Sequence, residues 1–159
     1  MYVFTIICLQ TNFPKGTMKL TLNLDDHLST LSAPESRQRF NGRCYDYVPT
    51  LLTWTDAQKN CQDQGGNLVS IHSEAENNFV VNLIENANPN LGDVWIGLTD
   101  PSVEGRWSDG SALSYTKWEV NEPDGATAAD TCVTTHCDLS TTWCDASCSE
   151  KHPSVCVYA

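Results

Sequence analysis

Acidic side chains recur through the second half of this chain, where they could act together on a cation. Carboxylates are spread over the segment from Asp100 to Asp145. Calcium is a hard cation that takes about six to eight oxygen ligands, mostly carboxylates and carbonyls. Surplus carboxylate on a protein often does no more than keep its surface solvated. Two interpretations therefore stand at this point, a site for a hard cation and a solvated acidic face.

Cysteines are the second chemically informative group. The 159 residues include eight cysteines, which is typical of a secreted protein and unusual for a cytosolic one. Four of them crowd together, at Cys132, Cys137, Cys144 and Cys148. Their spacings lack the paired C-x2-C knuckles of a zinc ribbon, so the pattern favours disulfides over a zinc site.

No spacing in the chain is typical of catalysis. Serine, histidine and acidic residues are all present, but no nucleophile elbow or H-E-x-x-H motif accompanies them. Cys144 beside Asp145 would need a free thiolate and a nearby base to act as a nucleophile. We therefore predict that the chain is not an enzyme.

The charge of the chain excludes two classes of partner. The formal net charge at pH 7 is -11, and the sequence contains no basic run. Binding to nucleic acid or to an anionic membrane surface needs lysine and arginine that replace counterions. No stretch approaches the roughly 20 apolar residues that span a bilayer. We expect no nucleic-acid partner and no membrane span.

Two helices are predicted in the first half of the chain. The first covers about Thr53 to Gln64 and ends at a glycine pair. The second opens with a capping box formed by Ser73 and Glu76. An apolar stripe at helical spacing faces a core; it consists of Phe79, Val80, Leu83, Ile84 and Ala87.

Short strands and long loops are predicted elsewhere. We expect strands at 40–48, 94–99, 132–136, 141–144 and 154–158, and a short extended piece at 68–71. Segments 105–107 and 115–118 flank a turn at Asp109-Gly110, and a loop without apolar periodicity runs from Glu119 to Thr131. Two helices followed by a mostly antiparallel sheet make an α+β domain. Its long loop is where such scaffolds carry function.

Several spaced motifs point to a family. The chain carries Trp95-Ile96-Gly97-Leu98, Glu122-Pro123-Asp124 and Trp143-Cys144-Asp145 in that order, between Cys61 and Cys156. With these motifs residues 40–159 resemble a C-type lectin domain, the calcium-dependent sugar-binding module. The resemblance implies the C-type lectin-like fold, with two helices, a mostly antiparallel sheet and a long loop region stapled by disulfides.

Residues 1–39 are expected to form an N-terminal leader or linker. Their short apolar run at 2–9 lacks the basic n-region and the clear cleavage site of a signal peptide. A degenerate signal segment and a mis-set start codon both fit this pattern.

The resemblance also implies two disulfides, Cys61–Cys156 and Cys132–Cys148. Cys137 and Cys144 are additional to the family's core set. They flank a tight hairpin across which they can face each other, so we predict a third bridge between them.

Cys44 matches a position that long-form family members pair with a cysteine about ten residues upstream, and this chain has none there. Cys44 is expected to pair with Cys8 or to remain a spare thiol that joins two chains. An oligomer through Cys44 or Cys8 is the partner hypothesis that follows.

The resemblance assigns a calcium site. In sugar-binding members the ion is held by a Glu-Pro-Asn or Gln-Pro-Asp loop, by an acid two residues before the next cysteine, and by the Asn-Asp of Trp-Asn-Asp. The matching residues, expected to bind both metal and sugar, are Glu122, Asp124, Asp130 and Asp145. Pro123 is the expected cis proline that turns its neighbours toward the metal. Four carboxylate oxygens, the Asp145 carbonyl and two sugar hydroxyls would bring the calcium shell to seven.

Two positions depart from the family pattern. Asp124 stands where mannose-type members have Asn, and Cys144 replaces a second Asn. Those amides donate hydrogen bonds to sugar hydroxyls, whereas carboxylates only accept them. Galactose-type members usually carry a following aromatic that stacks on the sugar, and residues 125–128 supply none. Mannose-like ligands are therefore slightly favoured.

An auxiliary calcium site of the family uses acids that match Asp100 and Glu104. Gly125 and Thr131 replace two of its other acids, so we expect this site to be weak or empty. The alternative is that Asp100 and Glu104 are surface turn residues.

The leading hypothesis is a secreted, extracellular, calcium-dependent carbohydrate-binding module with a glycan ligand. The alternative is a C-type lectin-like domain that binds a protein or another non-sugar ligand without calcium, its metal site having decayed.

Overall fold

The computed structural model describes residues 37–90, 92–99, 105–124 and 131–159. Its elements, in chain order, are β1 (Gln38–Phe40), β2 (Arg43–Leu52), α1 (Trp54–Asp63), β3 (Asn67–Leu68), α2 (Glu74–Ala87), β4 (Val94–Thr99), β5 (Arg106–Trp107), β6 (Thr131–Thr135), the 3-10 turn η1 (Cys137–Leu139), β7 (Trp143–Ser147) and β8 (His152–Tyr158). The two helices and the mixed sheet make the predicted α+β fold.

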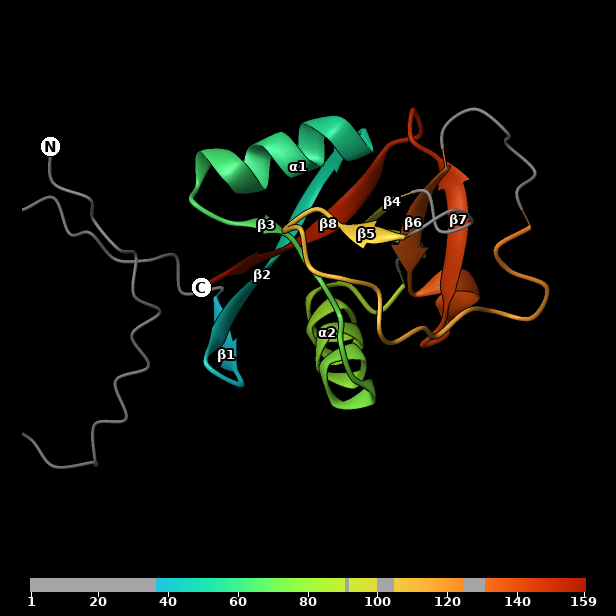
Figure 1. Cartoon of the computed structure of the whole chain (residues 1–159), viewed down its shortest axis with the longest axis horizontal. Helices are drawn as coiled ribbons and strands as arrows, with labels where there is room; N and C mark the ends of the chain where they lie inside the picture. The colour runs from blue at the N-terminus through green and yellow to red at the C-terminus, as the bar shows by residue number, and fades with distance from the viewer. Residues whose placement is uncertain (1–36, 91, 100–104, 125–130) are drawn as a thin grey trace, which may run out of the picture.

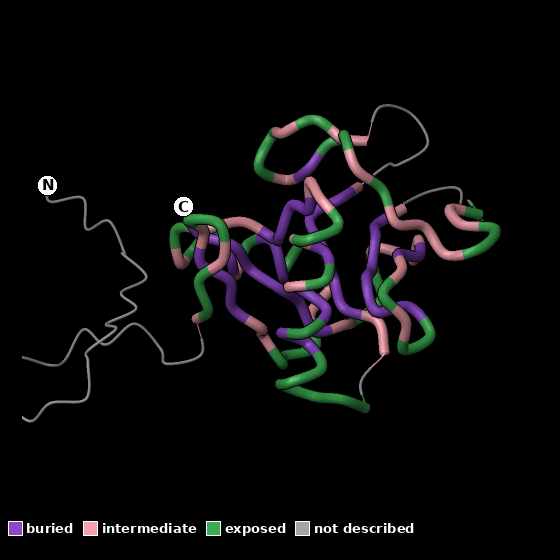
Figure 2. Tube along the Cα trace, turned by 90° about the horizontal axis from the view of Figure 1, so that it is seen from below, coloured by how far each residue is buried: buried purple, intermediate pink, exposed green. Residues whose placement is uncertain are grey.

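The strands form one sheet with the order β1-β2-β8-β4-β6-β7, to which β3 adds beside β8 and β5 beside β4. The pairs are antiparallel except β4 with β8, where Trp95 lies opposite Ser154 in parallel. Figure 1 shows α1 on one side of β2 and β8 and α2 on the other. The sheet is therefore covered on both faces where β2 and β8 lie. Figure 2 shows the buried residues that run through the strands.

Alternation along the strands creates two cores. On β2, Tyr45 packs in the cluster that contains the apolar face of α2, while its neighbour Cys44 packs in the cluster that contains α1. Successive side chains of a strand point to opposite faces. One strand therefore serves both helices.

Both helices begin where the sequence predicts. The Thr53 side chain accepts a hydrogen bond from Asp56 N, and the Ser73 side chain accepts one from Glu76 N. The Glu76 carboxylate accepts a hydrogen bond from His72 N at 2.6 Å. In a standard capping box the donor would be the backbone nitrogen of the N-cap residue, here Ser73, which is the next residue in the chain. Each cap satisfies backbone donors that have no partner within the helix.

Three disulfides staple the fold, and they are the predicted ones. Cys61–Cys156 joins α1 to β8, Cys132–Cys148 joins β6 to the turn after β7, and Cys137–Cys144 closes the hairpin between β6 and β7. The three sequence separations are 95, 16 and 7 residues. On the chain-entropy model such loops contribute about 4.7, 3 and 2.4 kcal/mol to the free energy of unfolding.

The structure differs from the sequence prediction at two turns. The predicted strand 40–48 is a hairpin, because Asn41 and Gly42 both have positive φ (47° and 79°) and turn the chain between β1 and β2. Asn-Gly is a strong hairpin signal, so the sequence did contain this turn. Around Asp109-Gly110, Trp107 N bonds Ser111 O, so this turn closes on itself. Segment 115–118 is no strand of that hairpin; Trp118 instead bridges to Trp143 in parallel.

Cys44 is a free thiol that is only 4% exposed in β2. An intermolecular disulfide through Cys44 would therefore require β2 to be displaced. Cys8 lies outside the described residues. No helix in the described part of the chain is both long enough and apolar enough to cross a bilayer.

Gly97 of β4 lies where two other segments cross the strand closely. Gly97 N donates to Val69 O at 2.9 Å, and Ser108 N donates to Gly97 O at 2.7 Å. A Cβ atom at this position would lie 2.6 Å from Ser108 Oγ and 2.7 Å from Leu68 O. We expect Gly97→Ala to lower the free energy of unfolding by about 1–3 kcal/mol, because the backbone must shift to admit the methyl group.

Urea unfolding of the purified protein measures this change, and Gly92→Ala is the matched control. A Cβ at Gly92 meets nothing within 4 Å, so this variant should stay within about 0.5 kcal/mol of the parent. Equal stability of the two variants would contradict the close approach at Gly97.

Candidate functional site

The loop that carries Glu122 and Asp124 lies beside β7 because backbone hydrogen bonds hold it there. Trp143 N donates to Lys117 O at 2.7 Å, and Glu119 N donates to Trp143 O at 2.9 Å. From this pairing of Glu119 with Trp143, Glu122 lies three residues further along the loop, and Asp145 lies two residues further along β7. Glu122 and Asp145, which are 23 positions apart in the sequence, are thereby brought together.

Glu119 fixes the start of this loop. Its carboxylate accepts hydrogen bonds from Val120 N at 2.9 Å, Thr142 Oγ1 at 2.5 Å and Ser140 Oγ at 3.3 Å. The Thr142 hydroxyl, followed by Val120 N, holds the pKa of Glu119 below its ordinary value. The sequence analysis did not assign Glu119 a role, because an acid at the head of a polar loop carries no local signal. Its partners lie 21 and 23 residues away.

After Glu119 the chain turns sharply. Glu122 N donates to Glu119 O at 3.0 Å, and Asn121 adopts a positive φ of 69° within that turn. The Glu122-Pro123 peptide bond is cis, as the sequence analysis expects. Asp124 follows as an exposed residue, whereas Glu122 and Asp145 are half-buried.

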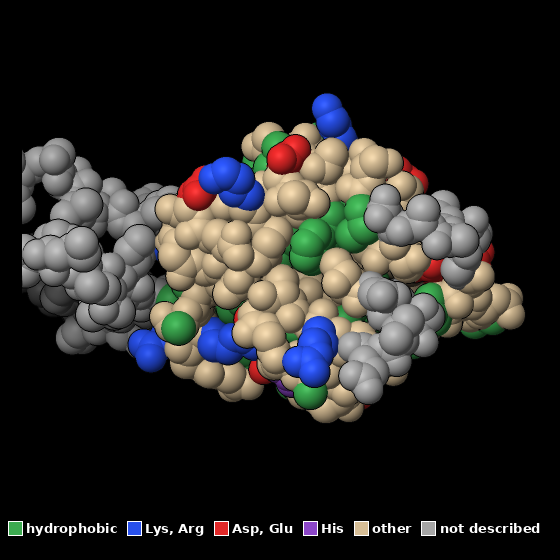
Figure 3. Space-filling model, turned by 45° about the horizontal axis from the view of Figure 1, so that its top comes forward, with side chains coloured by type: hydrophobic (Ala, Val, Ile, Leu, Met, Phe, Trp, Pro, Cys, Tyr) green, Lys and Arg blue, Asp and Glu red, His purple; other side chains and the backbone are tan. Residues whose placement is uncertain are grey.

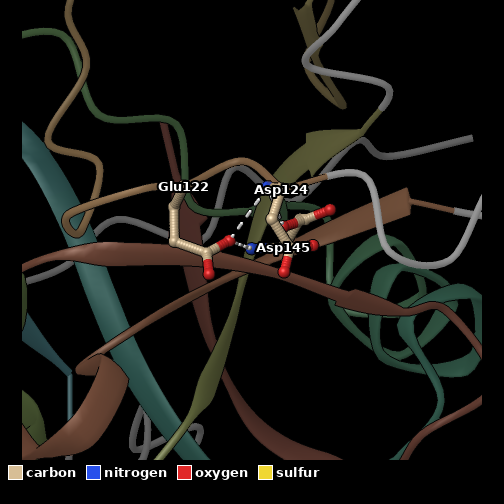
Figure 4. Close-up of side chains that lie close together, drawn as sticks. All are labelled: Glu122, Asp124 and Asp145. Carbon is tan, nitrogen blue, oxygen red and sulfur yellow. Dashed lines mark hydrogen bonds between the residues drawn. The ribbon is translucent and has the colours of Figure 1, made fainter.

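Glu122, Asp124 and Asp145 form one carboxylate cluster. Figure 4 shows the Glu122 carboxylate facing the backbone nitrogens of the other two residues. Glu122 Oε2 accepts from Asp124 N at 3.3 Å and from Asp145 N at 3.4 Å. Asp145 Oδ1 accepts from Asp124 N at 3.1 Å. Oxygen atoms of all three side chains lie within 4.8 Å of one another.

The carboxylates of Glu122 and Asp145 lie close enough to affect each other's protonation. The side-chain contact with Asp145, and then partial burial, raise the pKa of Glu122 above its ordinary value of 4.5. Two carboxylates this close favour a state in which one of them holds a proton. A divalent cation relieves the same repulsion.

The cluster fits calcium by its donor chemistry. Calcium binds carboxylate oxygens at about 2.3–2.6 Å, so two oxygens of one shell can lie up to roughly 5 Å apart. The three carboxylates satisfy that limit without rearrangement. They supply three negative charges against the two positive charges of the ion, and further oxygen ligands would have to complete the shell.

The remaining predicted site residues are placed as follows. Asp130, Asp100 and Glu104 lie outside the described residues. Cys144 takes no part in the cluster because its sulfur is bonded to Cys137. Lys and Arg side chains lie in separate groups on the face that Figure 3 shows, so that face presents no continuous basic patch.

A second polar cluster surrounds the turn after β5. Asp109 accepts from Ser70 Oγ and Ser111 Oγ, both at 2.5 Å, and Ser111 Oγ lies 3.0 Å from His72 Nε2. Burial alone would raise the pKa of Asp109, but the hydrogen bonds from Ser111 and Ser70 outweigh it and lower the pKa. In a hydrolytic triad the acid orients the histidine. Here Asp109 contacts the serines, so the cluster ties the turn to the segment between β3 and α2.

Comparison with known proteins gives a consistent result. The family model for the lectin C-type domain matches residues 50–158. Human lithostathine-1-beta is 37% identical over 131 residues, covering 80% of this chain and 79% of that protein. The galactose-specific lectin nattectin of Thalassophryne nattereri is 33% identical over 130 residues, covering 80% and 81%. The structure of a Ca2+-dependent type II antifreeze protein in its Ca2+-free form superposes with a TM-score of 0.70 at 32% identity, covering 80% of this chain and 100% of that one.

The charge repulsion at Glu122 generates a prediction. Replacing Glu122 by Gln is expected to stabilise the calcium-free protein at pH 7 by about 0.5 kcal/mol, the size typical of solvent-screened charge pairs. The folded-state pKa of Glu122 lies above 4.5, so the folded state binds this proton more tightly than the unfolded state does. The contribution of Glu122 to the stability of the parent should therefore fall as pH rises from 4.5 through the raised pKa.

Urea unfolding of the parent and of Glu122→Gln in chelator, at pH 7 and at pH 4, measures this effect. The advantage of the Gln variant should be present at pH 7 and small at pH 4, where Glu122 is protonated in both states. A Gln variant that is less stable than the parent at pH 7 would show that the contact with Asp145 is not repulsive.

Proposed function

The chain belongs to the C-type lectin domain family, and we propose that it is a secreted, calcium-dependent carbohydrate-binding module. The observation that carries the proposal is the carboxylate cluster, in which oxygens of Glu122, Asp124 and Asp145 lie within 4.8 Å of one another. Members of the family are non-enzymatic binding domains, and the arrangement of the described side chains agrees with binding.

Each residue of the cluster has a part in the proposed site. A carboxylate has two oxygens and about four lone-pair sites, so it can hold an ion and still accept a hydrogen bond from a hydroxyl. Glu122, Asp124 and Asp145 would hold the ion, and we propose Asp130 as the fourth ligand. Calcium, when bound, would coordinate two vicinal sugar hydroxyls. The chain would contribute acceptors only, so both hydroxyls must donate.

Glu119 acts on this site as a positioning residue. Its hydrogen bonds to Thr142 and Ser140 hold the loop against the residues that precede Trp143. The loop then delivers Glu122 to Asp145 in a fixed register, which reduces the ordering needed when the ion binds.

Secretion is part of the proposal, and so is the division of the chain. Three disulfides in a chain of this length agree with an oxidising, extracellular compartment. We assign the binding activity to residues 40–159 and the role of leader or linker to residues 1–39, of which Gln38 and Arg39 pair with β2 as part of β1. Asp100 and Glu104 are proposed to form at most a weak auxiliary site.

The sugar class is proposed as mannose-like. The support is that residues 125–128 carry no aromatic side chain to stack on a galactose ring. Asp124, which stands where mannose-type members have a donor amide, is a departure from the mannose-type motif. The similarity to nattectin, which is named as galactose-specific, makes galactose the comparison sugar in any test.

A non-sugar ligand is the second candidate function. It is favoured by the acceptor-only character of the cluster, which lacks the amides that orient sugar hydroxyls. It also agrees with the similarity to a protein named as a Ca2+-dependent antifreeze protein. In that case the same cluster would bind calcium and present an ordered loop to a different ligand, such as ice.

Calcium dependence is tested first by thermal unfolding. We expect calcium to raise the melting temperature of the parent, because a ligand of the folded state alone stabilises it by about 2.7 kcal/mol at 100 times its Kd. Glu122→Ala should abolish this shift, since it removes one ion ligand from the centre of the cluster. Asp63→Ala is the matched control, because Asp63 lies on the exposed face of α1, where its ion-pair partner among the described residues is Lys59, and should leave the shift unchanged.

A glycan array probed in calcium and then in chelator tests the ligand class. Calcium-dependent binding to glycans that is lost in Glu122→Ala supports the proposal. A calcium shift without any glycan binding favours the second candidate, which an assay of thermal hysteresis in ice growth would address. Glycan binding by Glu122→Ala equal to that of the parent would place the site elsewhere.

The departure at Asp124 generates a separate prediction. Asp124→Asn restores a donor for one sugar hydroxyl, so we expect tighter binding of methyl mannoside by up to about tenfold, since a neutral hydrogen bond contributes about 0.5–1.5 kcal/mol. Calcium affinity should fall modestly, because one charge that faces the metal is lost. Paired calorimetric titrations of calcium and methyl mannoside decide it, with methyl galactoside as the control sugar. Unchanged mannoside affinity would contradict the acceptor-only argument.

A further inference from the structure

A groove lies at the other edge of the sheet, between the two helices. It has a volume of about 670 Å³ and is lined by Gln38 of β1, by β2 residues 46–49, by Asn60 of α1 and Gln64 just after it, and by Leu83, Asn86 and Ala87 of α2. Figure 1 shows the two helices on either side of β2. Within the described residues β1 pairs with β2 only as far as Tyr45. The edge of β2 from Asp46 onward is therefore left without a strand neighbour on this side.

The groove contains a buried carboxylate that is incompletely satisfied. Asp46 is only 7% exposed, and its Oδ1 atom has no hydrogen-bond partner among the described residues. Leaving a buried acceptor of a charged group unpaired is costly, and an ionised carboxylate inside a protein normally has a cation or several donors around it. Asp46 therefore supplies a strong acceptor that the fold itself does not use fully.

Arg37, which directly precedes β1, directs part of its guanidinium group to other residues, while its buried Nε atom has no hydrogen-bond partner among the described residues. Arg37 stacks over the Tyr158 ring with its guanidinium carbon 3.7 Å from the ring centroid, and it donates to Gln64 Oε1 at 3.2 Å. Among the described residues no ion pair within 4.0 Å joins Asp46 to a cation. Among the described residues that line the groove there is no Lys or Arg, and Asp46 is the one carboxylic acid.

The rest of the lining sets the shape of a ligand. Val48, Leu83 and Ala87 offer apolar surface, and the amide side chains of Asn60 and Asn86 lie at the rim. Tyr47, on the next position of β2, also lines the groove, and its hydroxyl has no hydrogen-bond partner in the described part of the chain. One negative acceptor, one hydroxyl and an apolar wall suit a short alkyl chain that ends in a cationic donor.

We propose that this groove binds a small primary alkylamine, with its ammonium group on Asp46 and its alkyl chain along Val48, on the same face of β2. An ammonium group has three N–H donors and a compact charge. A hydrogen bond between two ionised partners is about twice as strong as a neutral one. A neutral alcohol of the same length satisfies the acceptor without the charge, and it binds more weakly. This site is independent of the carboxylate cluster at β7.

Titration of the 15N-labelled, oxidised full chain with n-hexylammonium chloride, followed by amide chemical shifts, tests the proposal. We expect saturable shifts confined to residues 46–49, 60–64 and 83–87, with hexan-1-ol binding at least tenfold more weakly. Equal binding of the alcohol, or shifts centred elsewhere on the chain, would overturn the proposal.

Variants separate the role of Asp46 from a general effect of charge. Asp46→Asn keeps the shape of the side chain and should weaken n-hexylammonium binding at least tenfold. Asp63→Asn, the same substitution at an exposed position of α1, should leave it unchanged. Ala87→Arg places a cation at the wall of the groove, on an exposed residue at the end of α2, and should also weaken binding at least tenfold.

Ala87→Arg keeps the test decisive if Asp46→Asn does not fold. Unaltered affinity in a folded Asp46→Asn protein, or in Ala87→Arg, contradicts the proposal. Weakening by Asp63→Asn equal to that by Asp46→Asn does so as well, because the effect would then be one of net charge.

Discussion

The fold depends on burying β8 on both of its faces. Six of its seven residues are buried, and it pairs with β2, β3 and β4. Val155 and Val157 face the cluster that contains the stripe of α2, while Cys156 and Tyr158 face the cluster that contains α1. The Cys61–Cys156 bond then ties α1 covalently to this strand. A strand that is covered on both faces is normally a continuous apolar run, as this one nearly is.

Trp143 connects the core to the carboxylate cluster, because its side chain is buried in the core and its backbone bonds the loop that carries Glu122. Its indole is fully buried among the rings of Trp107, Tyr115 and Trp118, and its Nε1 donates to Asn77 Oδ1 of α2 at 2.7 Å. The backbone of the same residue holds Lys117 and Glu119. A core residue thus sets the register between the loop and β7. The carboxylates of the cluster repel one another, and this repulsion is opposed both by the backbone N–H groups of Asp124 and Asp145, which donate within the cluster, and by the contacts of Trp143 outside it.

The two proposed sites lie at opposite edges of one sheet. The carboxylate cluster is built beside β7, the last strand in the sheet order, and the groove is built on β2 where β1 stops pairing. Both sites contain acidic side chains, and they differ in access. The cluster is open enough to receive an ion together with a large ligand such as a glycan, whereas Asp46 is buried and admits only a slender one.

The sequence by itself determined the elements that local patterns encode. The caps at Thr53 and Ser73, the stripe of α2 and the Cys137–Cys144 pair of the C-terminal hairpin all depend on local spacings. The other two disulfides were identified by resemblance to a family. The Asn41-Gly42 turn was encoded in the same way, although the alternation around Tyr45 obscured it. The acids of the cluster were identified by resemblance to a family, because nothing in their spacing states that they meet.

Only the tertiary structure decided which polar side chains lie together. Glu122 meets Asp145 because Trp118 bridges to Trp143 in parallel, a pairing between distant segments that no periodicity announces. The role of Glu119 depends on hydroxyls more than 20 residues away. The burial of Asp46 depends on two helices that close over an edge of the sheet. A strand pattern specifies which face a side chain takes, but the neighbours on that face are set by how distant elements pack.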